Sequence, residues 1–344
     1  MLGKLRSLFY LLGSILLIGV SLFYLTFYWD NTQFLDKKEI FIPSDADFEV
    51  LMEVVGPHIK SPRMFAWAAR LKGYQSRVRS GRYLLEPGAS NQELINRLRQ
   101  QSDPIRITFN NQERIENLAG RLAATLEADS LSFLKAMRNP TFLQENGFNQ
   151  TNALAMYIPN SYDVFWDINP AAFRDRMHRE YQQFWSSDRR NQAAVLGLTP
   201  LQVMGLASIV HKETVRPDER PTVAGVYLNR LKRRMKLQAD PTVIFALKQT
   251  YQNFDTVIKR VLYKDLRIPS PFNTYRIKGI PPGPIAMPDV SAIDAVLWPE
   301  NHSYLYFVAN PNRPGYHLFA STLSQHNRNK RRYTMWLNRQ KLYR

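Results

Sequence analysis

The chain has 344 residues, of which 44% are hydrophobic and 22% charged, a composition typical of folded proteins that excludes a mostly disordered one. It contains no cysteine, which rules out disulfide frameworks, thiol nucleophiles and cysteine-ligated zinc or iron sites. Lys and Arg exceed Asp and Glu by 46 to 29, a formal charge of +17, so the expected partner is a polyanion, an anionic membrane or an acidic polymer.

The N-terminus carries an apolar segment without charge from Leu8 to Tyr28, long enough for a helix that crosses a bilayer. Lys4 and Arg6 precede it, so the positive-inside tendency places residues 1–7 in the cytoplasm and the rest outside. A cleaved signal peptide is the alternative, but the apolar stretch is longer than usual and no small-residue cleavage site follows. Either way the bulk of the chain is exported, and a nucleic-acid partner is not expected.

A stalk and a small α+β module are expected over residues 29–104. Ser90 and Glu93 have the spacing of a capping box and mark the start of a helix. The expected elements are a stalk at 31–38, a strand at 39–42, helices at 47–55 and 61–71, a strand at 81–85 and the helix that follows Ser90.

Residues 105–198 are expected to form a linking α/β region. Alternation of Ile105, Ile107 and Phe109 predicts a strand. The pattern then predicts helices at 112–126 and 131–137, a turn at 159–162 and one long charged helix from 170 to about 196.

The third region, residues 199–344, opens with a helix that we expect to be buried. Thr199 and Gln202 form a capping box, and the residues that follow are apolar nearly all round. Glu213 extends an apolar stripe at the end of this helix, and burial of a carboxyl group favours its protonated form, so Glu213 is a candidate general acid. The alternative is a helix-end glutamate paired with Lys212 or Arg216.

Further along, Asp218 and Asp240 are each expected to cap a helix, the latter with Pro241 at its first position. The rigid run Pro281–Pro284 suits the fixed wall of a groove. A hairpin is expected from 303–309 and 316–320, followed by a basic helix from Thr322. The six histidines show no zinc-ligand spacing, and no metal or cofactor is expected.

Several sequence blocks taken together resemble the MltG (YceG-like) family of endolytic murein transglycosylases. The blocks are LASIVHKET from Leu206, DERPTVAGVYLNRL from Asp218, LQADPTVIFAL from Leu237, FNTYRIKGIPPGPI from Phe272, YLYFV from Tyr304 and HLFASTLSQHN from His317. The resemblance implies an α+β architecture. Its parts are one N-terminal transmembrane helix over 8–28, a LysM-like subdomain where SGRYLLEPGASNQELINRL stands, and a larger catalytic subdomain.

The resemblance also assigns the site. In the family's E-K-E-T block the glutamate before Thr is catalytic, and it maps to Glu213, whereas His211 replaces the first glutamate. The family's Pro-Asp-Thr-Tyr and Glu-His-Asn motifs carry Asn160 and Gln325 here, so no acid is expected at either position. The residues expected to line the glycan groove or hold Glu213 are Asn229, Gln238, Asp240, Asn273 and Tyr275.

The implied reaction cuts the β-1,4 bond between N-acetylmuramic acid and N-acetylglucosamine in nascent peptidoglycan without water and leaves 1,6-anhydro ends. The implied partners are glycan strands and penicillin-binding cell-wall synthases, at the bacterial inner membrane. Two alternatives stay open. One is a hydrolase that uses Glu213 with Asp218, Glu219 or Asp240 as second carboxylate; the other is a non-catalytic wall-binding protein tethered to the membrane.

Overall fold

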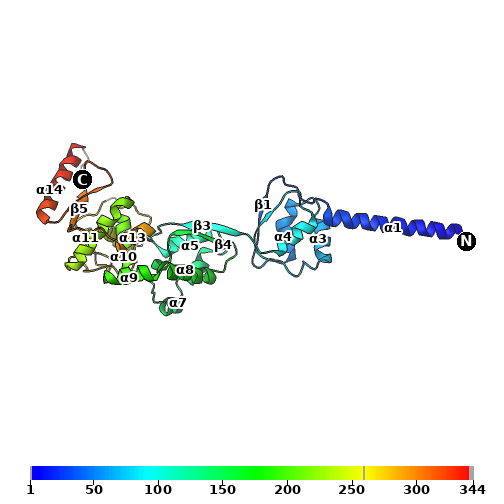
Figure 1. The fold of residues 1–344 in the computed structure, drawn as a ribbon, viewed down its shortest axis with the longest axis horizontal. Helices are drawn as coiled ribbons and strands as arrows, with labels where there is room; N and C mark the ends of the chain where they lie inside the picture. The colour runs from blue at the N-terminus through cyan, green and yellow to red at the C-terminus, as the bar shows by residue number, and fades with distance from the viewer. Residues whose placement is uncertain (1, 259, 341–344) are drawn as a thin grey trace. The chain divides into compact units, whose positions relative to one another are not determined.

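The computed structural model describes residues 2–258 and 260–340. The chain forms two compact units (Figure 1). Unit 1 comprises the chain up to Ile107 together with Thr125–Ala128 and Tyr162–Asn169, and unit 2 comprises Thr108–Ala124, Asp129–Ser161 and the chain from Pro170 onward. The expected mixture of helices and short strands is confirmed.

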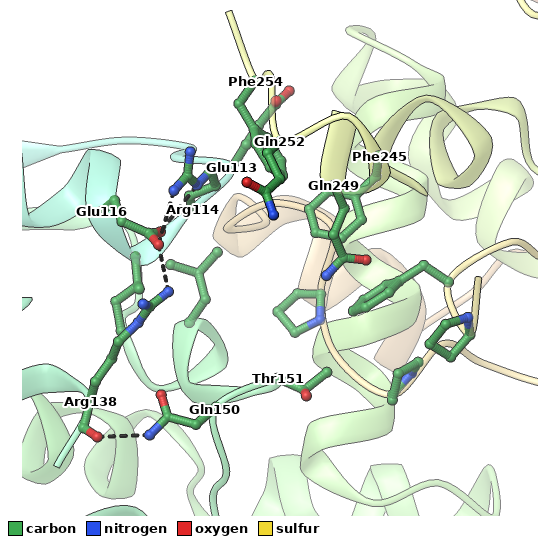
Figure 2. A pocket seen from close by; sticks show the side chains of 16 residues that line it. Glu113, Arg114, Glu116, Arg138, Gln150, Thr151, Phe245, Gln249, Gln252 and Phe254 are labelled. Carbon is green, nitrogen blue, oxygen red and sulfur yellow. Dashed lines mark hydrogen bonds and ion pairs between the residues drawn. The ribbon is translucent and has the colours of Figure 1, made fainter. Parts of the chain in front are cut away.

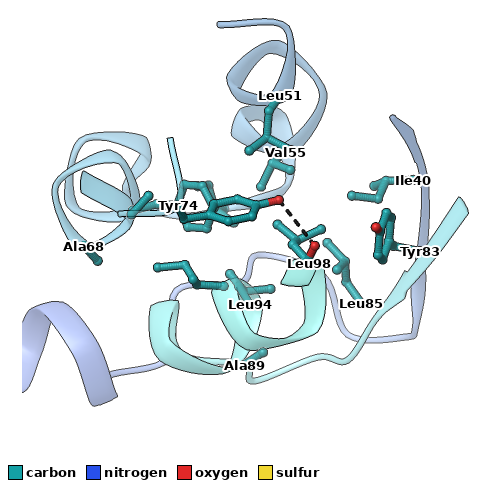
Figure 3. Packing of buried hydrophobic residues seen from close by; sticks show 14 of the residues in the cluster. Ile40, Leu51, Val55, Ala68, Tyr74, Tyr83, Leu85, Ala89, Leu94 and Leu98 are labelled. Atoms are coloured by element: carbon teal, nitrogen blue, oxygen red, sulfur yellow. Dashed lines mark hydrogen bonds between the residues drawn. The ribbon is translucent and has the colours of Figure 1, made fainter. Parts of the chain in front are cut away.

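Unit 1 packs helices against one antiparallel strand pair. Its elements are α1 (Leu2–Tyr28), β1 (Lys38–Ile42), α2 (Phe48–Val55), α3 (Pro62–Leu71), β2 (Gly81–Leu85) and α4 (Asn91–Arg99). In the pair, Lys38 lies opposite Leu85 and Ile42 opposite Gly81. Leu51, Tyr74 and Leu98 are fully buried between the helices and the strands (Figure 3). The predicted capping box of Ser90 and Glu93 is present at α4.

Helix α1 is the one candidate membrane span by length and composition within the described residues, with a mean hydropathy of 2.2 over Arg6–Tyr28. Its last turn belongs to unit 1. Phe27 is buried in the core, and the Asn91 side chain donates hydrogen to the Thr26 carbonyl at 2.7 Å. The side chain of Asn31, which is also buried, donates to the Asn91 side chain at 2.7 Å, and its Oδ1 accepts from the backbone N–H of Ser61 at 2.7 Å. The expected stalk is therefore wrong at its start, because these hydrogen bonds hold the chain against the module.

Strands β3 (Pro104–Phe109) and β4 (Asn160–Phe165) pair with each other. The predicted turn at 159–162 is wrong, because β4 begins at Asn160. Tyr162 and Val164 are buried at alternate positions. That period of two favours a strand over the local turn preference of the Pro-Asn-Ser sequence.

Unit 2 is mainly helical around α10. Its helices are α5 (Ile115–Ala123), α6 (Ser130–Met137), α7 (Pro140–Glu145), α8 (Pro170–Phe184), α9 (Ser187–Val195), α10 (Pro200–Glu213), α11 (Arg220–Lys232), α12 (Asp240–Thr250), α13 (Val290–Leu297) and α14 (Leu323–Arg339). Strands β5 (Tyr306–Ala309) and β6 (His317–Ala320) form the expected hairpin. Every residue of α10 from Val203 to Val210 is buried, and α10 packs against α11, α12 and α13. The capping box of Thr199 and Gln202 is confirmed.

Three helix boundaries differ from expectation. The long helix at 170–196 is two helices, because Trp185 turns into the core and the Ser186 side chain caps α9. Asp218 lies in a 3-10 turn, Pro217–Glu219, and is not the cap of α11. Asp240 is the first residue of α12, and its N-cap Ala239 offers no side-chain hydrogen bond, so the carboxylate of Asp240 is free to bind elsewhere.

Candidate active site

Glu213, the last residue of α10, lies in the wall of a cavity of about 330 Å³ in unit 2. The end of α10 meets α11, the segment before α12, the hairpin and the start of α14 at this cavity. The lining residues are Glu213, Tyr227, Arg230, Gln238, Asp240, Tyr275, Tyr306, Phe307, Leu323 and His326. Four predicted site residues from three separate segments of the sequence are thus brought together: Glu213, Gln238, Asp240 and Tyr275.

The carboxyl group of Glu213 has one oxygen held by the protein. The Tyr227 hydroxyl donates to Oε1 at 2.6 Å, whereas Oε2 has no hydrogen-bond partner among the described residues. Burial raises the pKa of Glu213 to about 7, against an opposing contribution from the Tyr227 hydrogen bond. The Asp240 carboxylate raises this pKa further. At neutral pH both protonation states of Glu213 are therefore populated, which a group that first donates and then accepts a proton requires.

Arg230 is buried beside this carboxyl group but is committed to the backbone. Its guanidinium donates to the carbonyls of Leu305 and Leu237, each at 2.6 Å, and lies 5.4 Å from the centre of the Tyr306 ring. Its charge lowers the pKa of Glu213, but less than burial raises it. Arg230 thereby ties α11 to the hairpin and to the segment before α12, which positions three walls of the cavity.

Asp240 and Tyr275 form a second hydrogen-bonded pair in the cavity. The Tyr275 hydroxyl donates to Oδ1 of Asp240 at 2.6 Å. Burial and the Asp240 charge raise the pKa of Tyr275 above its ordinary value, so it stays a donor. Gln238 has a positive φ of 50°, a left-handed conformation for a non-glycine residue, and its backbone N–H donates to the Thr274 carbonyl at 3.2 Å.

The two predicted asparagines lie outside the cavity lining. The Asn229 side chain donates to the carbonyls of His302 at 2.8 Å and Tyr304 at 3.1 Å. Buried Asn273 donates to the carbonyls of Leu266 and Ile268, and its Oδ1 accepts from the backbone N–H of Tyr275 at 3.0 Å. Asn273 therefore fixes the turn that presents Tyr275.

The other expected partners of Glu213 are engaged elsewhere. Lys212 pairs with Glu113 at 2.7 Å, and Arg216 lies over the ring of Tyr316, so the predicted pairing of Glu213 with either cation is wrong. His211 contacts Asp289 at 3.2 Å, and burial lowers its pKa.

Two of the three carboxylates considered for a second catalytic acid lie outside the lining. Asp218 accepts from the Tyr316 hydroxyl at 2.9 Å. Buried Glu219 accepts from the His317 ring and backbone at 2.8 and 2.7 Å, and although burial raises its pKa, these contacts hold the pKa below its ordinary value. Asp240 alone of the three shares the cavity with Glu213.

Sequence reasoning missed several lining residues, above all Tyr227 and Arg230. Both lie in α11, most of whose residues are buried. A buried phenol or guanidinium needs a hydrogen-bond partner. Polar side chains on this helix were therefore the signal in the sequence that could have indicated site residues. Tyr306 and His326, whose rings stack 5.2 Å apart, gave no such signal. No cluster of three or more metal-ligating side chains occurs in the described residues.

Comparison with known proteins places these features in a family. The family model described as YceG-like family matches residues 40–332. The chain is 28% identical over 315 residues to the endolytic murein transglycosylase of Bacillus subtilis, covering 85% of this chain and 83% of that protein. It is 24% identical to the endolytic murein transglycosylase of Streptococcus pneumoniae strain D39, of which it spans about half, 53%.

A solved structure has the same fold. The YceG-like protein lmo1499 of Listeria monocytogenes aligns with a TM-score of 0.57 at 24% identity, covering 85% of this chain and 98% of that one. The match of the family model to residues 40–332 identifies the chain as a member of the YceG-like family.

Proposed function

We propose that this protein is an endolytic murein transglycosylase in which Glu213 is the single catalytic acid and base. The main support is that the Glu213 carboxyl group lies in the cavity wall with a pKa of about 7. Among the described residues, only one of its oxygens accepts a hydrogen bond from the protein. The names of the Bacillus and Streptococcus relatives support the substrate class.

In the proposed reaction, protonated Glu213 donates its proton to the glycosidic oxygen between N-acetylmuramic acid and N-acetylglucosamine, and the bond from C1 to that oxygen breaks. The carboxylate so formed then takes the proton of the muramic acid 6-hydroxyl. That oxygen bonds to C1 and closes a 1,6-anhydro ring. Water is not consumed, and Glu213 returns to its acid form. The intramolecular nucleophile is already close to C1, which favours ring closure.

Tyr227 and Asp240 adjust the proton affinity of Glu213 in opposite directions. The Tyr227 hydroxyl favours the carboxylate and so assists the first step, in which Glu213 gives up its proton. The Asp240 charge favours the protonated form and assists the second step. The buried Arg230 stabilises the negative charge between the two steps.

We include the placement of the protein in this proposal. Helix α1 is compatible with a single-pass anchor, with residues 1–7 in the cytoplasm and the remainder outside the bacterial inner membrane. The module within residues 29–104, with β2 and α4 where the LysM-like sequence stands, would be the part that holds glycan. A tether at the membrane keeps the enzyme beside nascent strands and the penicillin-binding synthases that make them.

A two-carboxylate hydrolase is the second candidate, favoured by one observation. Asp240 lines the same cavity as Glu213 and could orient a water. The hydrolytic product contains one water more than the anhydro product.

Mass spectrometry of digested sacculi tests the proposal. The wild type is expected to release anhydro-muropeptides, and Glu213→Gln to release none while still binding sacculi. Glu180→Gln, on the surface of α8, is the matched control and is expected to cut normally. Hydrated ends in place of anhydro ends would support the hydrolase, and undiminished turnover by Glu213→Gln would reject both.

A further inference from the structure

Unit 2 contains a second and larger hollow, of about 800 Å³, outside the Glu213 cavity. Its walls come from the segment before α5, the loop before α7, the turn around Thr151, the end of α12 and the proline run, where Pro282 and Pro284 line it. Figure 2 shows Glu116 and Arg138 on one side and Gln249 on the other. The proline run was expected to form the wall of a groove, and two of its prolines line this hollow. Gly283 approaches the Thr151 carbonyl so closely that a Cβ would clash.

Helix α12 connects this hollow to Glu213. Asp240, at its start, lines the Glu213 cavity, while Pro241 and Ile244 line a small hollow of about 190 Å³. Phe245 lines both the small and the large hollow, and Gln249 the large one. Residues 241, 244, 245, 248 and 249 recur at three- and four-residue spacing, so they share one face of the helix. From 240 to 249 the helix rises about 14 Å. The Glu213 cavity, the small hollow and the large hollow are therefore lined in turn by successive residues of α12.

The large hollow and the small hollow beside it, taken together, carry more positive than negative charge. The lining of the large hollow has two arginines and two glutamates, and the small hollow adds two lysines while sharing Glu113 with it. Glu116 is shared by Arg114 at 2.9 Å and Arg138 at 2.5 Å. Glu113 is shared by Lys212 at 2.7 Å and Lys248 at 2.8 Å.

Across the two adjoining hollows four cations thus face two carboxylates, and all six side chains keep part of their surface accessible. An incoming carboxylate would balance the excess.

The rest of the wall suits a peptide. Phe245 and Phe254 contribute apolar rings, whose centres lie 5.7 Å apart. The exposed side-chain amides of Gln249 and Gln252 have no hydrogen-bond partner in the described part of the chain, so both are open to a ligand. The apolar surface and free amides of the large hollow, with the surplus cations of the adjoining small hollow, match a short acidic peptide better than an uncharged sugar.

We infer that the large hollow binds the acidic stem peptide of the murein strand whose glycan lies at Glu213. This rests on the proposed function and adds a second point of substrate recognition to it. Binding at a distance from the scissile bond supplies energy that positions the sugar at the reacting centre. The enzyme then cuts strands that carry peptides faster than strands stripped of them.

The test compares full-length enzyme on glycan strands with intact stem peptides and on the same strands stripped by an amidase. Gln249→Glu adds a negative charge to the hollow without removing a protein contact. It is expected to lower kcat/KM on peptide-bearing strands by about tenfold, a cost of like-charge placement. Its rate on stripped strands stays at the wild-type value. Gln249→Lys is expected to keep or increase the rate on peptide-bearing strands.

Gln183→Glu is the control, because Gln183 is also the penultimate residue of an exposed helix end, in α8, and lines none of the three hollows. Equal losses by Gln249→Glu on both substrates would make the hollow a sugar site and overturn the inference. No loss on either, or equal wild-type rates on both substrates, also overturns it. Failure of the wild type to cut either substrate would instead reject the proposed function.

Discussion

Glu213 and Glu113 are two partly buried carboxyl groups in the same unit, and their pKa values are shifted in opposite directions from the ordinary value. Burial raises the pKa of both. At Glu213 the one direct donor is a neutral phenol, and the pKa reaches about 7. At Glu113 two ammonium groups donate, and they hold the pKa below its ordinary value. The charge of the hydrogen-bond partner, together with the depth of burial, thus separates a proton donor from a structural anion.

Replacing each glutamate by glutamine separates the two roles, and the largest effect is expected at Glu213. Loss of a general acid and base typically costs 10²–10⁴ in rate, so Glu213→Gln is expected to lower turnover of sacculi by about a thousandfold. Glu113→Gln is expected to retain turnover within about tenfold, because Glu113 lies outside the Glu213 cavity. Comparable losses from both variants would contradict the distinction.

Stability is expected to respond in the reverse order. Glu113→Gln leaves Lys212 and Lys248 without their carboxylate, and we expect a loss of about 2 kcal/mol in the free energy of unfolding at pH 7. Because the folded pKa of Glu113 is lowered, this stabilisation is complete above the unfolded pKa and disappears as the pH falls through the folded pKa. Denaturant titrations at pH 7 and pH 3 measure it. Glu180→Gln, which removes a looser surface pair at 3.6 Å, should cost less than about 0.5 kcal/mol.

For Glu213 the sign is opposite. Its folded pKa of about 7 lies above the ordinary value of 4.5, so the folded state loses stability as the pH rises from 4.5 to 7 and the loss persists above 7. Glu213→Gln is therefore expected to be more stable than the wild type by about 3 kcal/mol at pH 8 and similar to it at pH 4. A variant that is less stable at pH 8 would show that the carboxyl group is not held against its ionisation. Thermal melts at the two pH values provide the comparison.

The pH dependence of turnover tests whether Tyr227 lowers the pKa of Glu213. Tyr227→Phe removes the donor that favours the carboxylate, so the pKa of Glu213 rises. The alkaline limb of the pH–rate profile should move upward by about one pH unit, the worth of one hydrogen bond to a charged group. An unmoved limb would mean that the phenol does not set the proton affinity of the acid.

The smallest shift is expected from Asp240→Asn. Removing a nearby negative charge lowers the pKa of Glu213, and the alkaline limb should move downward by about half a pH unit. Products should remain anhydro-muropeptides. A loss of turnover above about 100-fold, together with hydrated ends in the wild type, would identify Asp240 as the base of a hydrolase.

The sequence predicted best what depends on near neighbours. The caps at Ser90 and Thr199, the buried α10 and the β5–β6 hairpin follow local patterns, and all are present. Where a tertiary partner competes with a local preference the prediction failed, as at β4, whose strand pairing with β3 overrides a turn sequence.

The site divides in the same way. The burial of Glu213 could be predicted, because the apolar residues that precede it at helical spacing belong to the same helix, α10. The hydroxyl of Tyr227, however, reaches Glu213 from a different helix, and Tyr275 reaches Asp240 across 35 residues of sequence. Asn229 and Asn273 were expected to line the groove or to hold Glu213, but their amides bind backbone carbonyls, because an asparagine in the sequence does not reveal which groups its amide will meet.

The hydrogen bond from Asn91 to the Thr26 carbonyl has a mechanical consequence. Because this hydrogen bond joins them directly, the last turn of α1 and the rest of unit 1 are expected to move as one rigid body. In a lipid layer, any roll or tilt of α1 would turn unit 1 by the same angle, so a bilayer whose thickness alters the tilt would also re-aim the module.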